Sequence, residues 1–143
     1  MMVDPQERSV GNPRIEVFFA HQRRQYEPGD RLAVRYVVEG CEGEMIRVIE
    51  HSVVWYTEGK GEEDLGVHFF ERITDRGAVA SAGRDGAFET TLPASPLSYE
   101  GLIVKVRWCV RVRLFFASGR DFVSEHVFLV GRIPPARLPP RGL

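Results

Sequence analysis

Four cationic side chains alternate with apolar ones along one stretch of this sequence and form its most distinct candidate site. They are Lys105, Arg107, Arg111 and Arg113. Residues two apart on one face of a strand lie about 6.6–7 Å apart, so this row repels itself unless anions lie nearby. Guanidinium groups form bidentate pairs with phosphate or carboxylate, which suits binding of an acidic or phosphorylated peptide. Alternatively, acids of neighbouring strands neutralise the row on a solvated face: Glu89, Asp121 and Glu125.

The sequence contains few patterns that would support catalysis or metal binding. The spacing of the four histidines, His21, His51, His68 and His126, is not that of metal ligands, and there is no CxxC pair. Cys109 lies within the cationic row, which would lower its pKa if it were exposed, but a mid-strand cysteine is more often packed. No G-x-S-x-G elbow, phosphate loop or dinucleotide fingerprint is present. We therefore expect no enzymatic activity, no cofactor and no metal.

The residues between the cationic side chains predict the element that holds them. From Leu102 to Phe116 every even position is apolar: Leu102, Val104, Val106, Trp108, Val110, Val112, Leu114 and Phe116. Alternation with a period of two is typical of a strand with one buried face. Fifteen residues at about 3.3 Å each span roughly 50 Å, well beyond the usual strand. The sequence thus predicts a long strand with an apolar face and a cationic face.

The rest of the chain predicts further strands joined by turns rich in glycine and proline. They are expected at residues 14–19, 31–39, 45–57, 67–73, 87–92 and 122–130. The second of the long strands changes phase, which a bulge near Ile49 or Glu50 would explain. Residues 74–86 have weak strand character, and no segment predicts a convincing helix. Seven or eight strands without helices indicate an all-β fold of two packed antiparallel sheets.

The turn after the long strand allows two registers. A three-residue turn at Ser118–Arg120 sets Phe116 against Phe122. The same register pairs Arg113 with Glu125. A two-residue turn would instead place Glu125 on the apolar face, where an unpaired charge is costly. The three-residue turn is therefore preferred.

Several motifs between residues 14 and 131 together resemble the N-terminal half of arrestin-like proteins. In that family a Y-x-P-G-E turn opens an early strand, and an L-P…P-S-Y-x-G approach leads into a long alternating strand. The matching segments here are YEPGD at Tyr26–Asp30, WYT at Trp55–Thr57, GKG at Gly59–Gly61, LPASPLSYEG at Leu92–Gly101 and FLVG at Phe128–Gly131.

The resemblance implies an immunoglobulin-like β-sandwich that binds other proteins and has no catalytic centre. Full arrestins carry two sandwiches in tandem, whereas this chain has length for one, so properties that need two domains are in doubt. A homodimer that restores the second sandwich is compatible with this difference. In arrestin-like domains the first strand lies near a sheet edge, which can accept a partner strand. In this chain Ile15, Val17 and Phe19 would face the core, with Glu16 and Phe18 outward.

Composition sets the broad class. The 143 residues are 43% hydrophobic and 27% charged, as in one globular domain. A net charge of −1 argues against a general nucleic-acid binder. No apolar run approaches the roughly 20 residues of a membrane helix, and Cys41 and Cys109 are expected as thiols rather than as a disulfide. We expect a cytoplasmic protein with a flexible leader at 1–13, an arrestin-like β-sandwich at 14–131 and a proline-rich extended tail at 132–143.

Two functions are expected from these observations. The first is a non-enzymatic interaction module, a scaffold or adaptor that binds a protein partner through a sheet edge, the cationic face or both. Its candidate contact residues are Glu16, Phe18, Lys105, Arg107, Arg111 and Arg113. The alternative is a module that binds a sugar or lipid on the sandwich surface. Exposure of Trp55 and Tyr56 in a shallow groove would favour that alternative.

Overall fold

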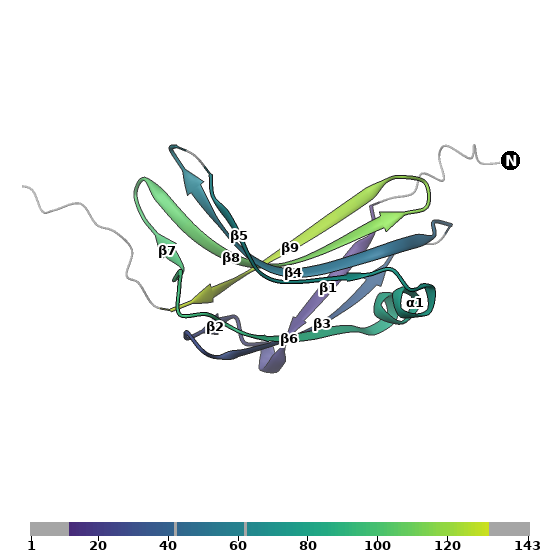
Figure 1. Ribbon diagram of the computed structural model, residues 1–143, viewed down its shortest axis with the longest axis horizontal. Helices are drawn as coiled ribbons and strands as arrows, with labels where there is room; N and C mark the ends of the chain where they lie inside the picture. The colour runs from purple at the N-terminus through teal and green to yellow at the C-terminus, as the bar shows by residue number, and fades with distance from the viewer. Residues whose placement is uncertain (1–11, 42, 62, 132–143) are drawn as a thin grey trace, which may run out of the picture.

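A computed structural model describes residues 12–41, 43–61 and 63–131, which form two packed β-sheets (Figure 1). The elements in chain order are β1 (Arg14–Phe19), the 3-10 turn η1 (Ala20–Gln22), β2 (Gln25–Tyr26), β3 (Arg31–Glu39), β4 (Ile46–Gly59), β5 (Leu65–Ile73), α1 (Arg76–Asp85), β6 (Gly86–Thr91), β7 (Tyr99–Glu100), β8 (Val104–Phe116) and β9 (Asp121–Val130). The expected all-β sandwich is confirmed. The predicted tail, and the predicted leader apart from Asn12 and Pro13, lie outside the described residues.

The small sheet has the strand order β1-β3-β6, and the large sheet has the order β2-β9-β8-β4-β5, with β7 paired to β8. All pairs are antiparallel except the two-residue pairing of β2 with β9. The central strands β4 and β8 run beside each other from Ile46 opposite Phe116 to Gly59 opposite Val104. This long pairing carries both the core and the cationic row.

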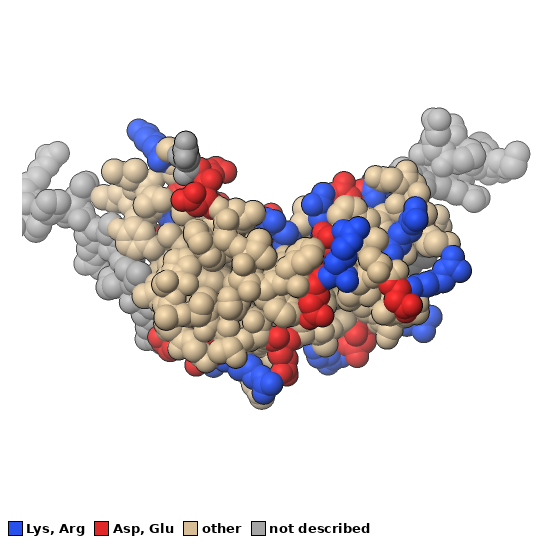
Figure 2. Space-filling model, in the orientation of Figure 1, with Lys and Arg blue, Asp and Glu red and all other residues tan. Residues whose placement is uncertain are grey.

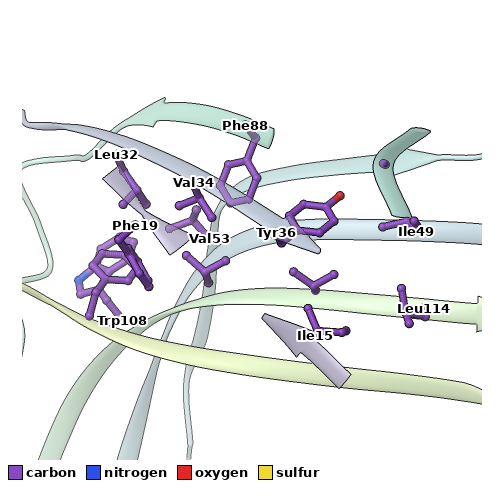
Figure 3. Packing of buried hydrophobic residues seen from close by; sticks show 14 of the residues in the cluster. Ile15, Phe19, Leu32, Val34, Tyr36, Ile49, Val53, Phe88, Trp108 and Leu114 are labelled. Atoms are coloured by element: carbon purple, nitrogen blue, oxygen red, sulfur yellow. The ribbon is translucent and has the colours of Figure 1, made fainter. Parts of the chain in front are cut away.

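The apolar face of β8 is buried between the two sheets from Trp108 to Phe116, as the alternation predicts, whereas Val104 at the start of the strand is 38% exposed. Its five inward side chains are at most 3% exposed: Trp108, Val110, Val112, Leu114 and Phe116. They pack against residues of the small sheet that include Ile15, Phe19, Leu32, Val34 and Tyr36 (Figure 3). Burying one large aliphatic or aromatic side chain stabilises a fold by about 1.5–3 kcal/mol. This layer is therefore the main source of stability.

The strand β8 begins later than the sequence predicts. Leu102 and Ile103 lie in the tight turn between β7 and β8 and are 64% and 71% exposed. The turn is closed by a hydrogen bond from the Gly101 amide to the Val104 carbonyl. Leu102 fits the alternation only because it is apolar. An apolar residue in a turn cannot be distinguished from an apolar residue in a strand by its type alone.

The expectation of strand character for residues 74–86 is wrong, because most of this segment forms the helix α1. Asp75 caps the helix by accepting a hydrogen bond from the Ala78 amide at 2.9 Å. Val79 and Ala82 lie three residues apart and turn one face inward, where they are buried. The helix packs on β3 and β4 at one end of the sandwich (Figure 1).

The hairpin of β8 and β9 differs from the predicted register by two residues. Leu114, rather than Phe116, lies opposite Phe122, and Arg111, rather than Arg113, lies opposite Glu125. A shift of two preserves the faces, because side chains alternate with a period of two. Glu125 therefore stays off the apolar face, as the three-residue turn predicts, whereas the predicted pairing of Arg113 with Glu125 is wrong.

Two irregularities bend the large sheet. One lies between Ile46 and Val48, earlier in β4 than the bulge predicted near Ile49 or Glu50. The other lies opposite β5, between Val53 and Val54. It turns Val67 outward, with 58% exposure, although strict alternation along β5 would place Val67 on the same face as Phe69.

Candidate functional site

The cationic row lies on the outer face of the large sheet, and each member contacts an acid. The ion pairs are Lys105–Glu100 at 3.5 Å, Arg107–Glu58 at 3.0 Å, Arg107–Glu100 at 3.4 Å, Arg111–Glu125 at 3.3 Å and Arg113–Asp121 at 2.6 Å. Four cations therefore meet four acids, and the row has no excess charge. Of the acids predicted as partners, Asp121 and Glu125 take this role. Glu89 instead pairs with Arg31 on the small sheet.

The thiol of Cys109 lies beneath the row and is fully buried. Its Sγ donates to Glu125 Oε2 at 3.4 Å, and no disulfide joins it to Cys41. Burial, with the nearby carboxylate of Glu125, raises the pKa of Cys109 to about 12. The thiol is thus protonated at neutral pH, which is the opposite of an activated nucleophile.

Beside the row, the outer face of the large sheet holds a hollow of about 430 Å³. Its lining combines one aromatic ring, one arginine and several acids: Tyr56, Glu58, Glu63, Asp64, Leu65, Arg111 and Glu125. Burial raises the pKa of Tyr56, so its hydroxyl stays protonated. Trp55 points to the inner face, opposite Trp108, and covers Gly66 so closely that a Cβ there would lie 2.1 Å from its ring. The two adjacent aromatic residues therefore do not form one exposed platform.

The first strand forms an edge of the small sheet, because β3 is its only partner among the described strands. Ile15 and Phe19 are buried, while Glu16 and Phe18 lie on the exposed face. The Phe18 side chain is 50% exposed. A hollow of about 430 Å³ adjoins it, with a lining that includes Ala33, Arg35, Ala87 and Glu89.

The histidines of β4 and β5 have structural contacts. His51 is 2% exposed, lies 2.8 Å from the Tyr36 hydroxyl through Nδ1 and stacks on Phe88. Burial lowers its pKa. His68 reaches the Thr91 carbonyl at 2.8 Å and so joins the two sheets. Within the described part of the chain, no group of three or more potential ligands is placed to hold a metal ion.

The cations that the structure leaves unpaired were not among the sequence candidates. Among the described residues, only Arg47, Lys60, Arg76 and Arg84 have no carboxylate, carbonyl or aromatic partner. The three arginines line one groove between α1 and the start of β4. Predicting this groove from sequence required predicting the helix α1. The capping residue Asp75 was the available signal for that helix.

Comparison with known proteins supports the fold. No family model matches the chain, and no curated protein matches its sequence. The structure is similar to Spo0M, a sporulation control protein from Bacillus subtilis, with a TM-score of 0.58 and 17% identity over 87% of this chain. The match spans only 51% of Spo0M. A superoxide reductase (neelaredoxin) from Ignicoccus hospitalis aligns over 90% of this chain and 88% of its own, with 15% identity and a TM-score of 0.49. The similarity to Spo0M shows the β-sandwich fold alone.

Among the described residues, no helix has the length and apolar character needed to cross a membrane.

Proposed function

We propose that this chain is a non-enzymatic interaction module, an arrestin-like single sandwich that adds an extended segment of a protein partner to the edge of β1. The observation that carries this proposal is the edge itself, with Phe18 half exposed beside a hollow. The backbone groups of an edge strand bind a partner strand through hydrogen bonds. The exposed Phe18 ring is then available to contact a side chain of the added strand on the outer face of the sheet, which gives specificity.

The cationic row is the weaker of the two predicted contact surfaces. An acidic ligand there must compete with carboxylates already in place, such as Glu58 at 3.0 Å from Arg107 and Asp121 at 2.6 Å from Arg113. Exchanging one ion pair for another brings little net free energy in an exposed setting. The edge of β1 requires no such exchange.

Two matched substitutions test this proposal. Phe18 and Phe70 are 50% and 51% exposed, and they lie on edge strands of opposite sheets. Phe18→Asp should reduce partner recovery at least tenfold in affinity capture from the source cell, because it places a charge beside the binding edge. Phe70→Asp should leave recovery unchanged. Hydrogen exchange on the recovered complex should show protection of residues 14–19.

Equal recovery with both variants would contradict the assignment to β1, as would protection confined to β8. A second copy of this chain is another occupant of the same edge. Light scattering distinguishes the two occupants. Self-pairing gives an average mass that rises from that of the monomer to that of the dimer as the protein concentration increases, and Phe18→Asp should abolish this rise.

A second candidate function is binding of a small sugar or lipid in the hollow beside the cationic row. The observation that favours it is that the hollow is lined by an aromatic ring, Tyr56, together with the polar side chains of Arg111 and Glu125. Calorimetric titration with a panel of oligosaccharides and fatty acids tests it. Binding that disappears in Tyr56→Ala supports this candidate, and the absence of heat across the panel removes it.

A further inference from the structure

The largest groove described above lies between α1 and the start of β4. It has a volume of about 740 Å³. Its apolar lining includes Val38, Met45, Ile46 and Val79. Met45 is 60% exposed although it is a large apolar side chain. A concave apolar surface of this size matches the usual range for binding sites, about 300–1,000 Å³.

Three arginines surround this apolar lining: Arg47, Arg76 and Arg84. All three are exposed and have no partner among the described residues. The one described acid of the groove, Glu44, is already held by Arg120 at 2.7 Å and by the Ser118 hydroxyl at 3.1 Å. The described residues thus give the groove an excess of three positive charges. Figure 2 shows Lys and Arg side chains gathered at the end of the molecule where α1 lies.

The position of Arg76 is unfavourable for the helix itself. It occupies the first turn of α1, where no acidic residue follows the cap. The positive end of a helix dipole disfavours a cation there. Arg84, in the last turn, is placed favourably by the same rule. Helix stability therefore explains Arg84 but not Arg76.

The spacing of the two helical arginines indicates the shape of a ligand. Arg76 and Arg84 are eight residues apart, which is about 12 Å along a helix at 1.5 Å per residue. A ligand with a single anionic head group can pair with only one of these two arginines. An extended peptide rises about 3.3 Å per residue, so two acids separated by three residues match this distance.

We infer that this groove binds an acidic, apolar segment of a protein partner, in which two carboxylates flank about three apolar residues. The carboxylates pair with Arg76 and Arg84, and the apolar side chains cover Met45 and Ile46. The lining of this groove shares no residue with the hollow beside Phe18, so the groove adds a second contact surface to the proposed interaction module.

A peptide array with the whole chain tests this inference. Each labelled peptide carries two glutamates separated by one to seven leucine or valine residues, and a parallel set has glutamine in place of glutamate. Affinity by fluorescence polarisation should be highest at two or three intervening residues and at least tenfold lower for the glutamine set. The double variant Arg76→Gln, Arg84→Gln should lose at least tenfold in affinity.

A matched double variant, Arg14→Gln with Arg31→Gln, removes the same charge from ion-paired positions outside the groove. It should change peptide affinity by less than twofold. All four side chains are exposed, so circular dichroism and the melting temperature should confirm folding.

Four results would overturn the inference. The first is affinity that does not depend on the glutamate spacing. The second is an equal loss in both double variants, which would show a general charge effect. The third is absence of peptide binding combined with arginine-dependent binding of phosphatidylglycerol vesicles, which would assign the groove to lipid. Tenfold tighter peptide binding after deletion of residues 1–11 would assign the groove to this chain's own N-terminal segment, against a partner.

Discussion

At the scale of single residues, His51 makes the fold sensitive to acid. Burial lowers its pKa in the folded state, whereas the unfolded chain has the ordinary value of about 6.5. The unfolded state therefore binds more protons below this pH, and the free energy of unfolding decreases as the pH falls. His126 is shifted in the same direction by burial and adds to the effect.

We therefore expect urea unfolding to show a lower stability at pH 5.5 than at pH 7.5. Part of this difference should vanish in His51→Gln and another part in His126→Gln, because each variant removes one group with a lowered pKa. A pH dependence that is unchanged in both variants would show that other groups cause it.

Cys109 should be chemically inert in the folded protein. Its side chain is fully buried and its pKa is raised to about 12, so both access and thiolate are lacking. In a Cys41→Ser background, iodoacetamide at pH 8 should label Cys109 only after unfolding in urea. Mass spectrometry of the alkylated chain checks this. Labelling within minutes in native buffer would contradict the burial.

At the scale of elements, we expect alanine substitution to change the stability in opposite directions at two glycines. Gly83 lies near the end of α1, and Gly86 follows the helix directly. A Cβ at Gly86 would lie 2.2 Å from the ring of Tyr36, which is fully buried and cannot move aside. Gly86→Ala should therefore lower the free energy of unfolding by about 1–3 kcal/mol. A Cβ at Gly83 meets nothing within 4 Å, so Gly83→Ala should stabilise by about 0.5–1 kcal/mol through helix propensity. Denaturant titration measures both.

The cationic row should contribute little to stability or to partner capture. The side chains in the ion pairs of the row are 29–51% exposed, and pairs accessible to water contribute about 0–1 kcal/mol each. The triple variant Arg107→Gln, Arg111→Gln, Arg113→Gln should lose at most about 3 kcal/mol and keep partner recovery unchanged. Loss of partner recovery in a variant that still folds would show that the row is a contact surface.

The elements were predictable where one periodicity dominated. The alternation around Trp108 identified β8 and its buried face, and the alternation of Ile15 and Phe19 identified β1. Features set by local geometry were not predictable. Two such features are the bulge that turns Val67 outward and the two-residue shift that joins Arg111 to Glu125. Both depend on how strands pair, and the sequence of one strand alone does not determine that pairing. The small residues of 76–85 concealed α1, and with it the groove.

At the scale of the whole molecule, the order of the strands predicts the order of hydrogen exchange. β4 and β8 have neighbours on both sides within the large sheet, and Val53, Val110 and Val112 are fully buried. Their amides should exchange only through global unfolding, whereas those of β1 should exchange by local opening. Native-state exchange followed by mass spectrometry checks this order. Exchange of β1 as slow as that of β8 would contradict its position as an open edge.

The balance of charge on the row also affects how fast a partner arrives. Four cations that already face four acids produce a weak field beyond the Debye length, which is about 8 Å at physiological ionic strength. Diffusional encounter on that face is consequently not accelerated by long-range attraction. Acidic ligands approaching Arg47, Arg76 and Arg84 experience an uncompensated potential, and their association rate rises as salt is diluted. Salt titration of association rates thus distinguishes binding in the groove from binding on the row by kinetics alone.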